Sequence, residues 1–401
     1  MTIASFLLAL IAIFVAAKLF GEIAERVGQP AVLGELIGGV IVGVSGLHLV
    51  DPHNATIHLL SELGVILLLF LIGLETDLQK LMSVGGSATT VALVGVALPF
   101  AGGVAFGHFL GLRLMISVLL GASLTATSVG ITARVLSDLG HLKSDESQVV
   151  LGAAVVDDII GLVILTLVST LAGGGALTTL SVAKTILIAF GFVILAIVIG
   201  SKLAPYLIKV IARLRVARAI FFVAIVFAFT LAWIADRVGS AVIIGSFAAG
   251  LVLARTERGK QIEREVHDVA SFFVPIFFIV VGAAVDLRAL AGNYLWIGLG
   301  LTVIGIVGKV IAGYATLKKG LRRIVIGVGM IPRGEVGLIF AQIGLSTKLL
   351  DAGLYSAVAL MVMLTTLVTP PVLRVLLARG EKNERRGGVS DYVMDGPYDD
   401  V

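Results

Sequence analysis

Long apolar runs, separated by short polar connections, make up most of the 401-residue chain. A membrane-spanning helix needs about 20 predominantly apolar residues, and most of the runs reach or approach that length. The pattern predicts an all-α polytopic membrane protein with about 13 transmembrane helices. The predicted helices cover residues 2–20, 30–49, 57–74, 87–110, 113–137, 147–171, 178–203, 217–235, 239–254, 269–285, 294–316, 323–345 and 353–378.

Composition supports the membrane assignment. The chain is 58% hydrophobic and 14% charged, whereas soluble domains carry about 25% charged residues. The first run has no basic residue ahead of it and is as long as a full span, so we expect a retained helix rather than a cleaved signal peptide. There is no cysteine, which excludes disulfides and thiolate metal sites and leaves the redox compartment open.

The basic residues predict the orientation of the chain. If the N-terminus is outside, most of the 30 Lys and Arg residues fall in cytoplasmic connections. Only Arg113, Lys184, Arg237, Arg288 and Lys348 then lie outside. This bias is the positive-inside pattern. It predicts a multi-pass protein of the cell inner (plasma) membrane, with its N-terminus outside and its C-terminus cytoplasmic. The net charge of +4 therefore indicates orientation and contact with anionic lipid, with no nucleic-acid partner.

Two adjacent carboxylates, Asp157 and Asp158, fall near the middle of the run at 147–171. An aspartate at the centre of a membrane helix costs roughly 2.5–3.5 kcal/mol on insertion scales. The alternative is a pair satisfied by buried structural partners. The cost favours an ion or proton site.

Two predicted helices carry polar or helix-breaking residues at their centres. The fifth contains Thr127 and Ser128, followed by Gly130, so it is either unwound there or presents a polar face to a neighbour. The twelfth contains Pro332, which removes a backbone donor and breaks or kinks a helix. Six helices, a linker helix and six more would give two inverted six-helix repeats. Each repeat would have a discontinuous crossing helix in fifth place, as in many secondary transporters.

Three further charges lie inside predicted spans. Arg333 and Glu335 follow the proline of the twelfth helix. They could pair with each other or with the ends of the broken helix, as a structural pair or in direct contact with an ion. Lys309 is too deep to reach the interface easily, and Asp157 or Asp158 is its expected partner. Successive helical residues project about 100° apart, so one aspartate can face Lys309 while the other faces a water-filled cavity.

Other polar groups give weaker signals. Glu35, Glu75 and Asp77 are expected to be interfacial or satisfied by packing. The six histidines show no metal-ligand spacing, and no nucleophile–base arrangement or phosphate-binding loop occurs. We therefore expect neither an enzyme nor a bound cofactor.

Five segments carry a family resemblance. They are Leu-Phe-Leu-Ile-Gly-Leu-Glu at 69–75, Ala-Thr-Ser-Val-Gly-Ile-Thr-Ala-Arg at 126–134, Gly-Ala-Ala-Val-Val-Asp-Asp at 152–158, Gly-Lys at 308–309 and Pro-Arg-Gly-Glu-Val-Gly-Leu at 332–338. In this order they resemble the bacterial sodium/proton antiporters of the monovalent cation:proton antiporter superfamily, in the electrogenic branch with an Asp-Asp pair.

The resemblance implies a homodimer whose membrane domain, 1–378, works as an elevator. A dimerisation part would cover about 1–85 and 217–290, and a core part about 87–171 and 294–378. A linker helix at about 178–203 would join them, and 379–401 would be a short disordered cytoplasmic tail. It also implies that Asp158 binds the cation, that Asp157 pairs with Lys309, and that Thr127 lies at the helix crossing.

Departures from the family pattern bear on the transported ion. Some sodium-selective relatives have an acidic residue where Ser128 stands, so charge compensation at the crossing is expected through Glu335. Potassium-efflux relatives usually have Gln-Asp in place of Asp157-Asp158 and add a cytosolic nucleotide-binding domain. Asp-Asp stands here and we expect no nucleotide-binding domain, which favours the sodium branch.

These residues predict exchange of Na⁺ (or Li⁺) for H⁺ at Asp158, which holds either ion but not both. Exchange is electrogenic if Lys309 also carries a proton. The alternatives are a K⁺/H⁺ antiporter and a membrane sensor or channel of the same fold.

Overall fold

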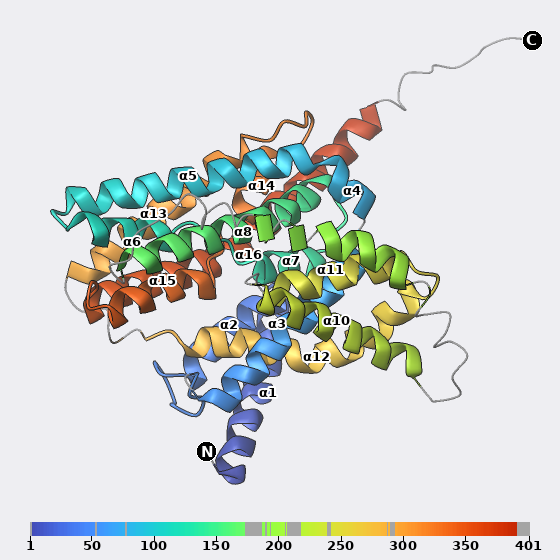
Figure 1. Cartoon of the computed structure of the whole chain (residues 1–401), viewed down its shortest axis with the longest axis horizontal. Helices are drawn as coiled ribbons and strands as arrows, with labels where there is room; N and C mark the ends of the chain where they lie inside the picture. The colour runs from blue at the N-terminus through green and yellow to red at the C-terminus, as the bar shows by residue number, and fades with distance from the viewer. Residues whose placement is uncertain are drawn as a thin grey trace, which may run out of the picture.

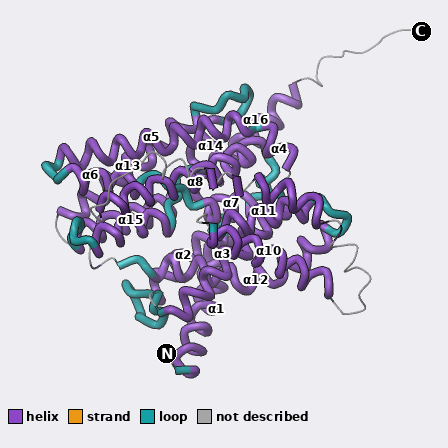
Figure 2. The backbone as a smooth tube through the Cα atoms, in the orientation of Figure 1, coloured by secondary structure: helices purple, strands orange, loops and turns teal. Residues whose placement is uncertain are grey.

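The computed structural model describes residues 2–52, 54–76, 78–172, 187–188, 191–192, 194–204, 206, 218–238, 242–286, 288 and 293–390. Within these ranges the side chains of 162, 166, 169–172, 335, 342, 346 and 379–390 are not described. The described backbone consists of helices and their connections, with no strand among them (Figure 2). The all-α prediction is confirmed.

Eight of the described helices are long and apolar enough to cross a membrane, and shorter apolar helices lie between them. The helices are α1 (Ile3–Arg26), α2 (Ala31–Val42), α3 (Ala55–Glu75), α4 (Leu78–Ser83), α5 (Gly85–Phe109), α6 (Leu114–Ser123), α7 (Val129–Asp138), α8 (Asp145–Ala172), α10 (Ala219–Arg237), α11 (Val242–Ala254), α12 (Gly259–Ala283), α13 (Asn293–Gly313), α14 (Arg323–Gly329), α15 (Glu335–Ser346) and α16 (Ala352–Ser390).

Most predicted spans have a helix at the same place, but several ends differ. The predicted helix at 178–203 lies largely outside the described residues, although Ile194–Ala204 is helical. Helix α12 begins at Gly259 rather than 269. Its charged first turns are amphipathic, because Ile262 and Val266, four residues apart, are fully buried.

The end of the last helix also differs from the expectation. Helix α16 continues to Ser390, through residues predicted to begin a disordered tail. The reason is local, because residues 381–386 are mostly Glu, Lys and Arg, which have high helix propensity. The expected disorder of 391–401 concerns residues outside the described ranges.

The helices pack in two groups (Figure 1). The first group contains α1, α2 and α3 packed with α10, α11 and α12. The second contains α5, α6 and α8 packed with α13, α14, α15 and α16. Helix α7 bridges the groups, since it contacts α2 and α3 on one side and α8 and α16 on the other. Each group draws helices from both halves of the sequence.

Glycines set the helix crossings of the first group. Helix α2 crosses α12 through Gly39 and Gly282, and α3 crosses α11 through Gly73 and Gly250. A Cβ on any of the four would lie 2.1–2.3 Å from a carbonyl oxygen of the facing helix. Small residues allow this close approach between membrane helices, so these positions exclude any larger side chain unless the helices separate.

Ion pairs connect the start of α8 to the segment that precedes α14. Lys318 Nζ lies 2.5 Å from Asp145 Oδ2. The side chain of Glu146 accepts hydrogen bonds from the backbone N–H and the Nε of Arg322, at 3.2 and 3.3 Å. These contacts hold the helix that carries the aspartate pair against the second half of its own group.

Candidate functional site

Both helices predicted to be discontinuous are interrupted. Helix α6 ends at Ser123 and α7 begins at Val129, while α14 ends at Gly329 and α15 begins at Glu335. The breaks therefore contain Thr127 and Gly334, as predicted. Pro332 cannot donate a backbone hydrogen bond, which accounts for the second interruption.

The two interrupted segments bond to each other. The backbone N–H of Ser128 donates to the Pro332 carbonyl at 2.8 Å, and the Thr127 hydroxyl donates to the Met330 carbonyl at 3.1 Å. Non-helical backbone at membrane depth is tolerated only where it is buried in protein or lines a cavity. The crossing supplies the hydrogen bonds that each broken helix lacks.

Arg333 spans the crossing and is fully buried. Its Nη1 donates to the carbonyls of Thr125 and Ala126 at 2.8 and 2.7 Å, just beyond the C-terminal end of α6. A cation is favourable at this negative end of a helix dipole. Of the two partners expected for Arg333, the end of the broken helix is thus observed. The side chain of Glu335 lies outside the described part of the chain, so its role at the crossing stays a prediction.

Asp157 and Lys309 form a buried ion pair. Lys309 Nζ donates to Asp157 Oδ2 at 2.9 Å, and neither side chain is exposed. The lysine comes from α13 and the aspartate from α8, so the pair joins the two halves of the second helix group. Asp157 Oδ1 has no hydrogen-bond partner among the described residues.

Asp158, the next residue of α8, faces a different environment. It lines a cavity of about 10 Å³ together with Thr127, Ser128 and Gly334 of the two breaks. This volume is close to the minimum that holds one water molecule, so a single small ion also fits. We call it the Asp158 pocket. The structure thus brings together Asp158, Thr127 and Ser128. Asp157, the preceding residue of α8, instead pairs with Lys309 of α13.

Two of the three weaker carboxylate signals, Glu35 and Glu75, are absent from the described lining of this pocket. Glu35 on α2 is buried, and its Oε2 has no hydrogen-bond partner among the described residues. Glu75, at the end of α3, accepts a hydrogen bond from the Ser137 hydroxyl at 3.3 Å, which links the first helix group to α7. Asp77 lies outside the described residues.

A larger cavity of about 370 Å³ lies between the two helix groups. We call it the vestibule. Its walls come from α2, α3 and α12 on one side and α15 and α16 on the other, and its polar lining includes His58, Ser61, Glu62, Tyr355 and Thr366. No polar pattern in the sequence indicates this cavity, because most of its lining is apolar.

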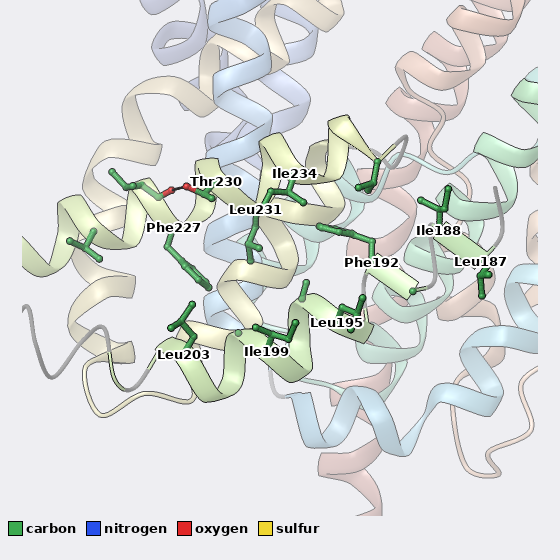
Figure 3. Close-up of a pocket in the computed structure, with 16 residues that line it drawn as sticks. Leu187, Ile188, Phe192, Leu195, Ile199, Leu203, Phe227, Thr230, Leu231 and Ile234 are labelled. Atoms are coloured by element: carbon green, nitrogen blue, oxygen red, sulfur yellow. Dashed lines mark hydrogen bonds between the residues drawn. The ribbon is translucent and has the colours of Figure 1, made fainter. Parts of the chain in front are cut away.

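A third cavity has no charged side chain among its described lining residues. It is a groove of about 930 Å³ between α10 and the described residues of the segment from Leu187 to Leu203. Figure 3 shows Phe227 of α10 directed toward Leu203 and Leu231 of α10 directed toward Ile199 on the facing segment. Among the described lining residues the polar side chain is that of Thr230, whose hydroxyl donates a hydrogen bond to the carbonyl of Val226 in its own helix. The described lining therefore offers no charged ligand for an ion.

Paired interrupted helices, an aspartate at their crossing and a buried compensating ion pair define an ion-coupled membrane transporter. The chain belongs to the sodium/hydrogen exchanger family, whose transmembrane region matches residues 7–379.

Relatives cover nearly the whole chain. It is 40% identical over 425 aligned positions to the high-affinity Na⁺/H⁺ antiporter NhaS3 of Synechocystis sp., covering 96% of this chain and 92% of the relative. It is 38% identical to the Na⁺/H⁺-K⁺ antiporter GerN of Bacillus cereus, covering 92% of this chain and 96% of the relative. The fold is similar to that of the sodium/proton antiporter MjNhaP1 from Methanocaldococcus jannaschii, with a TM-score of 0.73 at 19% identity and full coverage of both chains.

Proposed function

We propose that the protein is a secondary active antiporter that exchanges Na⁺ (or Li⁺) for H⁺ at Asp158. The position of Asp158 on a one-ion pocket between the two helix breaks carries this proposal. Asp157 and Lys309 form an ion pair, and Asp158 is a second carboxylate, placed at the pocket, whose charge a proton or a cation can neutralise. Exchange of the cation for a proton follows if the site moves across the membrane only when the Asp158 charge is neutralised by one of the two ions.

Thr127 and Ser128 supply the neutral oxygens of the proposed site. Both side chains border the Asp158 pocket, and hard cations prefer oxygen ligands. The Thr127 hydroxyl donates a hydrogen bond to the Met330 carbonyl. Its oxygen lone pairs are not used in that bond and can coordinate a cation. Arg333, bound to the carbonyls after α6, balances charge at the crossing, together with Glu335.

We propose that the two helix groups are the two parts of an elevator. The first group, about 1–85 and 217–290, would be the dimerisation part of a homodimer, and the second, about 87–171 and 294–378, the moving core. The proposal is supported by packing, because the aspartate pair, Lys309 and both breaks all belong to the second group or its bridging helix α7. The vestibule at the boundary would be the access path.

We also propose that the halves are inverted repeats. Gly34 on α2 packs against the Phe20 carbonyl of α1, and Gly245 on α11 packs against the Leu231 carbonyl of α10. The same spacing along the chain separates Phe20 from Leu231, Gly34 from Gly245 and Gly39 from Gly250. Equivalent glycines therefore make equivalent crossings in the two halves. With the positive-inside bias, this arrangement supports an external N-terminus and a cytoplasmic C-terminus.

The experiment is cation-induced proton movement in proteoliposomes that carry a pH gradient. Addition of Na⁺ or Li⁺ should dissipate the gradient with saturable kinetics. K⁺ is the second candidate, favoured by the similarity to GerN, and a larger response to K⁺ than to Na⁺ would replace the sodium assignment. Ion flux without coupled, saturable proton counterflow would indicate a channel and contradict antiport.

A further inference from the structure

The vestibule and the Asp158 pocket share part of their lining. Val65 of α3, Phe277 of α12 and Gly334 of the second break border both cavities. The vestibule also contacts His58 and Glu62, whose side chains are 61% and 44% exposed, so this end communicates with solvent. The shared residues therefore lie between the vestibule and the pocket that holds Asp158.

Val65 and Phe277 are held in place by a close helix crossing. A Cβ on Gly64 would lie 2.6 Å from the Phe273 carbonyl oxygen and 3.1 Å from the Phe277 Cβ. Helices α3 and α12 therefore approach closely at this level, and both Val65 and Phe277 are 5% exposed. Two apolar side chains thus stand between a solvated cavity and a carboxylate.

We propose that Val65 and Phe277 form an apolar partition that closes the Asp158 pocket to ions and water from the vestibule. A hydrated cation that met this pair would have to give up water without gaining a ligand, which is unfavourable. Only Gly334, the third shared residue, belongs to the break, and it has no side chain to offer.

The partition and the ion site lie on different helix groups. Val65 and Phe277 belong to α3 and α12, whereas Asp158 belongs to α8. Relative movement of the groups would carry Asp158 past the partition, so the partition would block ion passage except by that movement. This consequence rests on the proposed antiport function, whereas the barrier itself does not.

The chain contains no cysteine, so a single introduced cysteine reports accessibility without background. Ser61→Cys places a thiol in the vestibule, and Ala126→Cys places one in the Asp158 pocket alone. The rate of modification by a charged, membrane-impermeant methanethiosulfonate would be measured in intact cells and in everted vesicles. The face from which Ser61→Cys reacts faster defines the vestibule side without any assumption about orientation.

The decisive comparison combines Ala126→Cys with Phe277→Ala or with Val65→Ala. From the vestibule side, each should raise the modification rate of Ala126→Cys by about tenfold or more, because a barrier lowered by ~1.4 kcal/mol changes a rate tenfold. Phe278→Ala is the matched control. Phe278 is the next residue, is fully buried and borders neither cavity, so it should leave the rate unchanged.

An unchanged rate in the partition variants, an equal increase from both faces, or an equal increase in the Phe278→Ala control would overturn the proposal. If Phe277→Ala does not yield a monodisperse protein, Val65→Ala, which removes fewer atoms, decides the outcome alone. The readout is modification and not transport. Failure of the parent to exchange Na⁺ for H⁺ would therefore refute the proposed function and leave the partition test intact.

Discussion

Lys309 and Asp157 are fully buried, with Lys309 Nζ 2.9 Å from Asp157 Oδ2. Asp158, adjacent in sequence, instead borders the pocket at the helix crossing. Neighbouring residues on a helix project about 100° apart, so one turn of α8 can present its two carboxylates to separate surroundings. One carboxylate is paired with a buried lysine, and the other is placed where an exchangeable ion can enter.

Asp158→Asn should abolish Na⁺/H⁺ exchange and leave a folded protein. An amide keeps the shape of the carboxylate, but it has no charge to neutralise and cannot alternate between a bound proton and a bound cation. Proton-coupled Na⁺ uptake in proteoliposomes is the measurement. The matched control is Asp145→Asn on the same helix, where the side chain is partly exposed and paired with Lys318, and it should retain exchange. Coupled transport by Asp158→Asn would remove Asp158 from the site.

Na⁺ and H⁺ should compete for Asp158. Lowering the pH fills the carboxylate with protons, so the apparent KM for Na⁺ should rise while the maximal rate at saturating Na⁺ changes less. For one proton against one cation the limiting slope is about tenfold in KM per pH unit, by simple linkage. Initial rates at several Na⁺ concentrations and equal pH on both sides would measure it. An apparent KM independent of pH would contradict a shared site.

Arg333→Gln should lower the stability of the protein. The guanidinium donates to the carbonyls of Thr125 and Ala126 inside the crossing, and an unsatisfied buried acceptor costs roughly 1–3 kcal/mol. The melting temperature in detergent should therefore fall clearly. Arg237→Gln, at the exposed end of α10, is the control and should melt like the parent. Equal melting of both variants would mean that other groups satisfy the crossing.

The sequence allowed the helices, both interruptions and an aspartate partner for Lys309 to be predicted, because each leaves a local signal, and the family resemblance implied that the partner is Asp157. Apolar length predicts spans, Pro332 predicts a break, and charges deep in a span demand partners. Helix ends were less predictable. The start of α12 is charged, and the burial of Ile262 and Val266 against neighbouring helices anchors it as part of the same helix.

The vestibule and the glycine crossings could not be predicted in the same way. Val65 and Phe277 are ordinary apolar residues of apolar helices, and their position between two cavities depends on how α3 and α12 pack. The correspondence of Gly34 and Gly39 with Gly245 and Gly250 is present in the sequence. It is recognisable only from the structure, in which each of these glycines packs against an equivalent backbone carbonyl.

Gly39→Ala should separate α2 from α12. The added Cβ would lie 2.2 Å from the Ile279 carbonyl oxygen, and backbone cannot move aside as a flexible side chain can. We expect a lower melting temperature, with a loss of about 1–3 kcal/mol typical of overpacking. Gly85→Ala is the control, because a Cβ there has no neighbour within 4 Å and alanine favours a helix. Unchanged stability of Gly39→Ala would show that the crossing is loose.

The role of Lys309 can be separated from that of its ion pair. Removing one partner of a buried pair leaves an uncompensated charge and costs about 3–5 kcal/mol, whereas replacing both partners is often tolerated. Lys309→Gln alone should therefore be unstable, and the double variant Asp157→Asn with Lys309→Gln should fold.

Our hypothesis is that Lys309 releases its proton when the pair opens and so carries a second proton per Na⁺. The parent should then respond to an imposed membrane potential, because two protons exchange for one Na⁺. The double variant should still exchange Na⁺ for H⁺ through Asp158, but one for one and with little response to the potential. Sodium uptake at potentials set with K⁺ and valinomycin would measure this. Because K⁺ is itself a candidate substrate, a parallel series with potentials set by a permeant anion is the control. Equal voltage dependence in the parent and the double variant would leave Lys309 as a structural partner of Asp157.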